Sequence, residues 1–86
     1  MSALTFTEQD VWRRFEAWLN LHRKTRFSSD DLREYGLHKL LRDPSHQVGA
    51  IFAMKVREGE IVEIEREPSR IPSNHKRKIS VYEFAT

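Results

Sequence analysis

A chain of 86 residues without cysteine has room for one small domain, residues 1–86, and excludes disulfide bonds and thiolate metal sites. No run approaches the roughly 20 apolar residues of a membrane-spanning helix, and no secretion signal is evident, so we expect a cytoplasmic protein. The net charge of +2 hides a local asymmetry, because residues 66–78 hold five Lys and Arg but only one acidic residue, Glu67. A basic segment beside a near-neutral body is typical of nucleic-acid-binding proteins, although a solvated loop is commonly basic too.

The first predicted element is a helix over residues 7–23, with Thr7 as its N-cap and acidic residues in its first turn. Apolar and aromatic side chains recur in it at helical spacing: Val11, Trp12, Phe15, Trp18, Leu19 and His22. This spacing predicts that Trp12 and Trp18 are core residues and that His22 is partly buried. Neither tryptophan is therefore expected to form an exposed stacking platform for single-stranded nucleic acid.

A short extended segment, residues 23–27, separates this helix from a second one over residues 28–35. Ser28 and Asp31 form a capping box at its start, and Gly36 is placed to end it in a left-handed conformation. A connector follows that we expect to keep a helical turn and to add three leucines to the core: Leu37, Leu40 and Leu41.

Asp43 and Pro44 predict the start of a third helix over residues 44–58, because Asp is a favoured N-cap and Pro suits the first helical position. One side of this helix is apolar and carries Val48, Ile51, Phe52 and Val56. Lys55 falls on the same side, so we expect its ammonium group to reach past apolar surface into water. The opposite side presents small and polar residues: His46, Gln47, Ala50, Ala53, Met54 and Arg57.

After Gly59 the apolar period changes from 3.6 to 2 residues, which predicts strands at about residues 61–66 and 79–84. In the first strand two apolar residues alternate with two acidic ones: Val62, Glu63, Ile64 and Glu65. The segment between the strands is rich in proline, serine and basic residues and is longer than a tight hairpin turn. We therefore expect it to be a long basic loop.

Short motifs open the second helix, occupy the third and continue into the loop: Phe27-Ser28-Ser29-Asp30-Asp31-Leu32, Pro44, Gly49-Ala50, Phe52, Gly59, Ile61, Ser69, Pro72-Ser73, His75 and Val81-Tyr82. Their order resembles the small winged helix-turn-helix proteins of bacteria, especially actinobacteria, and of their phages. Lys55 departs from this pattern, in which a small residue would suit that position. The resemblance implies an α+β domain with three helices and a small three-stranded antiparallel sheet, in the order α-β-α-α-β-wing-β.

In that fold the third helix lies in the major groove, and the loop called the wing contacts phosphates or the minor groove. The candidate DNA contacts of the recognition helix 44–58 are Ser45, His46, Gln47, Ala50, Met54 and Arg57. Those of the wing, 66–78, are Arg66, Arg70, His75, Lys76, Arg77 and Lys78. Glutamine can bind adenine through two hydrogen bonds, and arginine suits guanine or phosphate. A second basic group, Arg23-Lys24-Arg26, either touches flanking backbone or complements the helix dipole.

These features predict a regulator of transcription, replication or recombination that binds double-stranded DNA. Because one copy reads only a few base pairs, we expect a homodimer or binding beside a partner protein. The alternative is a winged helix used as a protein-interaction module, such as a phage factor that binds or inhibits a host complex. Four glutamates favour this alternative, because they would repel phosphate on a face shared with the wing: Glu58, Glu60, Glu63 and Glu65.

Nothing in the sequence indicates an enzyme, a cofactor, a metal site or a small-molecule substrate. The four histidines lie in different elements and lack the spacing of a zinc site. Neither a phosphate-binding glycine loop nor a nucleophilic triad occurs. Asp30 and Asp31 form a carboxylate pair, but their position at a helix N-terminus explains both.

Overall fold

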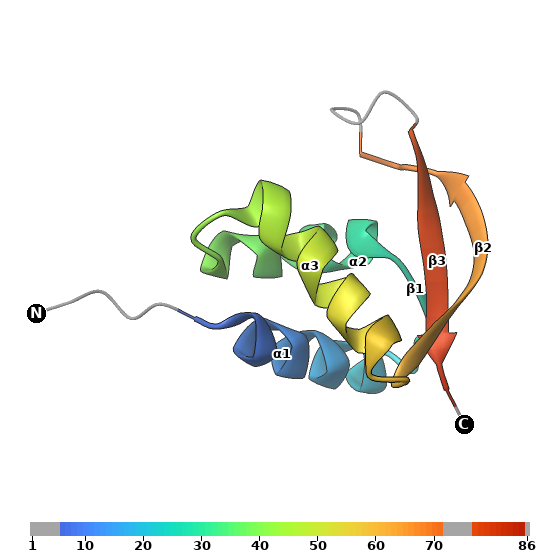
Figure 1. Ribbon diagram of the computed structural model, residues 1–86, viewed down its shortest axis with the longest axis horizontal. Coiled ribbons are helices and arrows are strands. Elements are labelled where there is room, and N and C mark those ends of the chain that lie inside the picture. Colours follow the sequence, from blue (N-terminus) through green and yellow to red (C-terminus); the bar gives the residue numbers. More distant parts are fainter. Residues whose placement is uncertain (1–5, 72–76, 86) are drawn as a thin grey trace, which may run out of the picture.

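The computed structural model describes residues 6–71 and 77–85, which form an α+β structure with three α-helices and a three-stranded antiparallel sheet. The elements follow the predicted order: α1 (Glu8–Leu21), β1 (Arg26–Phe27), α2 (Ser29–Glu34), the 3-10 helix η1 (Leu37–Leu40), α3 (Pro44–Arg57), β2 (Ile61–Pro68) and β3 (Lys78–Phe84). The helices lie together on one side of the sheet, and the β2–β3 hairpin extends beyond them (Figure 1). His75 and Lys76 lie outside the described residues.

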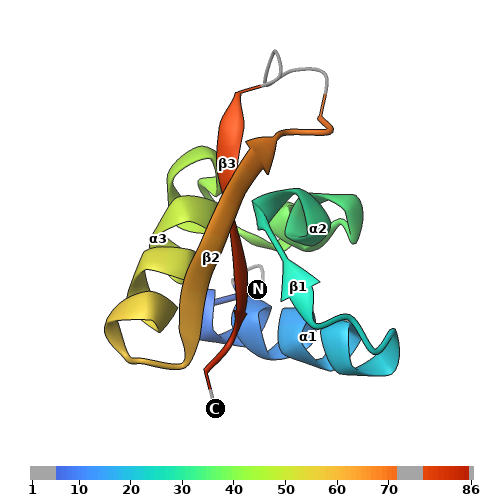
Figure 2. The same cartoon turned by 90° about the vertical axis from the view of Figure 1, so that its right-hand side faces the viewer.

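The sheet has the strand order β1-β3-β2, so β3 is central and pairs antiparallel with both neighbours. Viewed from the sheet side, α3 lies on one side of the β2–β3 hairpin and α2 on the other (Figure 2). The hairpin thus has α3 beside one of its faces, and the end of β2 lies next to α2 (Figure 2).

The predicted helix boundaries rest on local hydrogen bonds that the structure contains. At α1 the Thr7 N–H donates to Asp10 at 2.9 Å, and at α2 the Ser28 N–H donates to Asp31 at 2.8 Å. Both helices thus begin with a capping box. Gly36, with φ of 77°, follows α2 in the left-handed region that glycine tolerates without steric cost.

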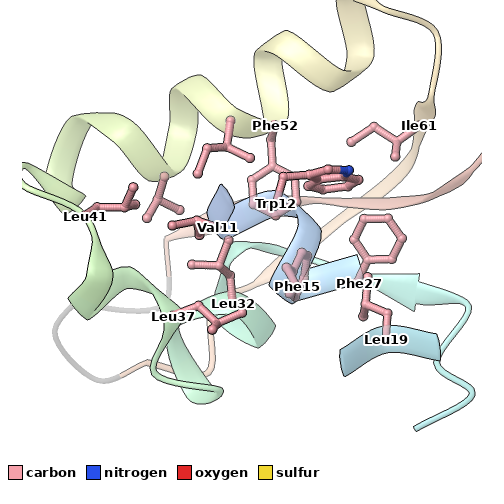
Figure 3. Close-up of a cluster of buried hydrophobic side chains, with 12 residues drawn as sticks. Val11, Trp12, Phe15, Leu19, Phe27, Leu32, Leu37, Leu41, Phe52 and Ile61 are labelled. Carbon is pink, nitrogen blue, oxygen red and sulfur yellow. The ribbon is translucent and has the colours of Figure 1, made fainter. Parts of the chain in front are cut away.

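The core lies among the three α-helices, η1 and the sheet (Figure 3). Phe15 is fully buried at its centre, with its ring centroid 5.6 Å from that of Phe27 and 5.9 Å from that of Phe52. Burying each such side chain contributes about 1.5–3 kcal/mol to folding. The buried apolar cluster consists of Val11, Trp12, Phe15, Leu19, Phe27, Leu32, Leu37, Leu41, Val48, Ile51, Phe52 and Ile61.

Trp18 and His22 are exceptions to the predicted core, and the prediction was wrong for both. Trp18 is 40% exposed, and its ring stacks on those of His22 and Tyr35 at centroid distances of 5.0 and 5.5 Å. His22 is exposed as well. The reason is that α2 has only six residues and ends at Glu34. Among the described residues, the rings that stack on Trp18 are those of His22, from the same helix, and Tyr35, which follows α2, and they cover the indole incompletely.

Lys55 does not extend into water as predicted but is 2% exposed. Its ammonium group donates hydrogen bonds to Gln9 at 2.9 Å and Glu58 at 3.1 Å, and lies 3.2 Å from the Glu60 carboxylate. Burial lowers the pKa of Lys55, but the hydrogen bonds to the two glutamates outweigh it, so the pKa lies above its usual value. The lysine remains charged and joins α1, α3 and β2 at this end of the domain.

Candidate nucleic-acid interface

One side of α3 is open to solvent, and it is the side predicted to face DNA. His46, Ala50, Ala53 and Arg57 recur there at i, i+4, i+7 and i+11, and all four are exposed. The predicted contact Met54 is half-buried at the edge of this side. No Asp or Glu occurs between the first and last residues of α3. We call this surface the α3 face; small side chains at its middle leave the helix backbone open to close approach.

The first turn of α3 is organised around Asp43. The Ser45 hydroxyl donates to the Asp43 carboxylate at 2.8 Å, and the His46 Nδ1 lies 2.8 Å from the other carboxylate oxygen. The amide oxygen of Gln47, four residues further on, accepts a hydrogen bond from the Asp43 N–H at 2.8 Å. Three candidate base contacts are therefore engaged with Asp43 at the start of the helix: Ser45, His46 and Gln47.

This arrangement has two consequences for base recognition. Reading adenine through two hydrogen bonds requires both the oxygen and the nitrogen of the glutamine amide, and the Gln47 oxygen already has a donor. In addition, the hydrogen bond from Ser45 and that with His46 lower the pKa of Asp43, so this carboxylate is ionised at neutral pH. A negative charge thus occupies the helix N-terminus, where a phosphate would otherwise be attracted.

A β-bulge in β2 separates glutamates that simple alternation would place on one face. Cross-strand partners share a face of the sheet, and Glu63 pairs with Tyr82 whereas Glu65 pairs with Val81. Tyr82 and Val81 are consecutive in β3, so their side chains point to opposite faces. The predicted regular alternation across Glu63, Ile64 and Glu65 was therefore wrong, because the register shifts between Glu63 and Glu65.

The Tyr82 side of the hairpin points toward α3, since the Tyr82 ring stacks on Phe52 with a centroid distance of 5.0 Å. We call it the inner hairpin face. Beyond Tyr82 the same face carries, by register, Ser80 with Arg66 and then Lys78. Glu63 is its acidic member; it accepts a hydrogen bond from Ser80 and lies 3.8 Å from Arg66.

The other three glutamates that would repel phosphate lie away from the inner hairpin face. Glu65 is on the outer face, 3.6 Å from Arg26. Glu58 and Glu60 surround Lys55 at the far end of α3. Of the four glutamates that favoured a protein partner, only Glu63 shares the inner hairpin face.

The end of β2 is attached to α2 through a buried carboxylate. Asp30 is fully buried and accepts hydrogen bonds from the Ser69 hydroxyl at 2.9 Å and from the Arg70 N–H at 2.7 Å. The Ser69 N–H in turn donates to the carbonyl of Arg77 at 2.8 Å. These bonds hold both strands of the hairpin at the base of its loop, so this end of the loop is fixed to the body of the domain.

The Arg70 side chain also takes part in this attachment, although it is partly exposed. Its guanidinium lies 3.1 Å from Asp31, 2.8 Å from Glu34 and 3.8 Å from Glu67. The hydrogen bond to Glu34 is the main cause that raises the pKa of Arg70 above its usual value. A side chain engaged by three carboxylates is a poor phosphate ligand, so Arg70 is not part of the candidate contact surface.

Two residues of the second basic group, Lys24 and Arg26, also form ion pairs. The Lys24 ammonium group lies 3.4 Å from Asp31, and Arg26 pairs with Glu65. These contacts favour a structural role for the group over contact with flanking DNA.

Several other cations remain available within residues 6–71 and 77–85. Arg57, Arg77 and Lys78 are exposed and have no ion-pair partner among these residues. Arg42, which the sequence interpretation missed, is exposed directly before Asp43 and is likewise without an ion pair in that part of the chain. Its position beside a predicted N-cap is a signal that could have identified it.

These cations do not form one cluster. Arg77 and Lys78 flank the hairpin loop, whereas Arg57 is at the C-terminal end of α3, which lies at the opposite end of the molecule (Figure 1). The 14 residues of α3 extend over about 20 Å. Arg57 thus lies on the α3 face, Arg66 and Lys78 lie on the inner hairpin face, and Arg77 lies next to Lys78 beside the loop, so these cations are spread over an extended surface.

Comparisons with family models, with curated proteins and with solved structures find no significant match to this chain. Among the described residues, no helix has the length and apolar character to cross a membrane. In the same part of the chain, no group of three or more His, Asp or Glu side chains could hold a metal ion.

Proposed function

We propose that this chain is a winged helix-turn-helix domain that binds double-stranded DNA with the α3 face and the inner hairpin face. The observation that supports this proposal best is the α3 face itself, which combines small residues at its middle with no carboxylate inside the helix. Entry into a major groove about 12 Å wide requires close approach of the helix, and flanking phosphates repel acidic side chains. The element order and the long hairpin beside α3 support the same fold assignment.

In this proposal the domain is held on DNA mainly by contacts between its cations and the phosphates. Arg57, Arg66, Arg77 and Lys78 are the cations that contact the backbone, and such contacts carry no sequence information. Base readout is limited in this proposal, because Ser45, His46 and Gln47 are engaged with Asp43. A semi-specific binder of this kind suits a regulator of transcription, replication or recombination that acts in more than one copy or beside another protein.

A single charged substitution on the α3 face tests this proposal. Ala53→Glu places a carboxylate where the helix is to meet DNA, and we expect it to weaken binding to any duplex by at least about tenfold at low salt. Ala53→Gln, of similar size but neutral, separates charge from bulk. Asn20→Glu adds the same charge to an exposed position of α1 and serves as the matched control.

The second candidate function is docking of another protein on the α3 face. The ionised Asp43 carboxylate at the start of α3 favours it, because this charge repels phosphate but does not repel an uncharged protein surface. The two candidates differ in a simple titration. A folded protein that does not shift a random-sequence duplex at low salt, and whose Ala53→Glu variant behaves identically, supports the docking function and contradicts DNA binding.

A further inference from the structure

A second stripe of side chains runs along the exposed side of α1, away from the core. Arg14, Ala17, Trp18 and Leu21 follow the spacing i, i+3, i+4 and i+7, with Trp18 40% and Leu21 72% exposed. The four residues line a shallow hollow of about 220 Å³. This volume is below the roughly 300–1,000 Å³ of small-molecule sites, so the hollow matches a side chain better than a ligand. Large apolar side chains gathered on a surface mark an interaction site.

We propose that this stripe binds the same stripe of a second copy of the chain, with the two α1 helices antiparallel about a two-fold axis between Ala17 and Trp18. Under that axis the stripe maps onto itself. Ala17 of each copy faces the partner's Trp18, and Arg14 faces the partner's Leu21. A two-fold interface requires this kind of self-complementarity, in which residue i contacts j and j contacts i. Small Ala17 leaves the space that the opposing indole fills.

The charges on α1 select the antiparallel orientation. The last turn of α1 contains no basic residue, and of the two cations that follow the helix, Lys24 lies 3.4 Å from Asp31, so the negative end of the helix dipole can take a further cation. The antiparallel pairing brings the partner's Arg14 to that end, at Leu21. A parallel pairing would instead place the two Arg14 side chains opposite each other, where like charges repel.

Trp18 is already ordered for such a contact. Its ring packs against two others that also contact each other, with centroids 5.0 Å from His22 and 5.5 Å from Tyr35. An anchor that is immobile before binding loses little side-chain entropy on association. The stripe is short, so the dimer is weak in free solution and belongs to the small end of the interface range.

The position of α1 leaves the rest of the molecule accessible in this dimer. It lies at the end of the domain away from the hairpin loop (Figure 1). If the proposed DNA binding holds, two copies bound on one duplex gain effective concentration for this contact. The dimer itself does not depend on that function, because its evidence is confined to α1.

Sedimentation equilibrium without DNA, from about 10 μM to about 1 mM protein, tests the proposal. We expect a concentration-dependent monomer–dimer equilibrium. Ala17→Glu brings two carboxylates together at the two-fold axis and should abolish the dimer. Asn20→Glu, with the same charge on an exposed position of the same helix but off the stripe, brings no like charges together and should not abolish the dimer.

The antiparallel register has its own test. Arg14→Glu should give a monomer, because the introduced carboxylate meets the negative end of the partner's α1. Arg14→Glu combined with Leu21→Lys should restore the dimer, since each introduced carboxylate then faces an ammonium group of the other copy. Circular dichroism checks that each variant is folded. A wild-type protein that is monomeric at about 1 mM, or a folded double variant that stays monomeric, overturns the proposal.

Discussion

Replacing Asp30 by alanine should destabilise the domain more than any other single change to an acidic residue described above. The Asp30 carboxylate is fully buried and accepts hydrogen bonds from the Ser69 hydroxyl and the Arg70 N–H, at 2.9 and 2.7 Å. In the alanine variant these two donors lose their acceptor inside the protein, at about 1–3 kcal/mol each. Loss of a charge from the first turn of α2 adds about 0.3–1 kcal/mol.

These contributions sum to about 2–7 kcal/mol, and about 3–5 kcal/mol, the usual cost of breaking a buried charged network by removing one partner, lies within that range. At roughly 0.05–0.15 kcal/mol per residue, a domain of this size has about 4–13 kcal/mol of stability in total. Asp30→Ala should therefore lower the melting temperature by roughly 15 °C or more. Asp30→Asn keeps one oxygen as an acceptor and should lose less.

Thermal and urea unfolding followed by circular dichroism measure both variants. Glu8→Ala is the matched control, because Glu8 is an acidic residue in the first turn of α1 and does not share the buried hydrogen bonds. It should lose only the helix-dipole contribution of about 0.3–1 kcal/mol. Equal destabilisation by Asp30→Ala and Glu8→Ala would refute the conclusion that Asp30 attaches the hairpin to α2.

Burial, followed by repulsion from nearby cations, lowers the pKa of His38 below its usual 6.5, and its Nδ1 atom is buried without a hydrogen-bond partner in the described part of the chain. The unfolded chain therefore binds the proton more readily, so the stability of the domain falls as pH drops below about 6.5; denaturation midpoints at pH 7.5 and 5 should show this loss, and His38→Leu should reduce it. Lys55→Met replaces a buried charge by an apolar side chain of similar length, so the free energy of unfolding should change by less than about 1.5 kcal/mol, whereas Lys55→Ala should lose about 2 kcal/mol or more; equal losses in urea unfolding would contradict the packing role of its stem. Gln47→Ala removes the acceptor of the Asp43 N–H and should cost no more than about 0.5–1.5 kcal/mol of stability while changing binding to selected and random duplexes equally; a loss confined to the selected duplex in a gel-shift assay would show base readout instead.

The architecture was predictable because its signals are local. Capping boxes at Thr7 and Ser28, glycines after α2 and α3, and the change of apolar period after Gly59 each act within a few residues. The predicted third helix and two strands differ from the observed elements only at their ends, as boundaries usually do. The α3 face followed from the same helical spacing.

The features that could not be predicted depend on residues far apart in sequence. Asp30 and Arg70 are separated by 40 residues, and nothing near Arg70 indicates that carboxylates of α2 surround it. Lys55 is buried because Gln9, 46 residues away, and two glutamates meet it. The exposure of Trp18 depends on the length of α2. In each case tertiary packing decides whether the residue is buried or exposed and which groups it contacts, and the local sequence pattern had indicated a different environment.

The measurement that tests DNA binding most directly is the salt dependence of affinity for a random-sequence duplex. Four phosphate contacts by Arg57, Arg66, Arg77 and Lys78 predict a slope of log affinity against log salt of about −3.6, at 0.9 per contact. Changing Arg77 and Lys78 together to glutamine should reduce the slope by about 2, whereas Arg13→Gln on the exposed side of α1 should leave it unchanged. Absence of binding at low salt, or a folded Arg77/Lys78 double variant with the wild-type affinity and slope, would contradict the proposed function.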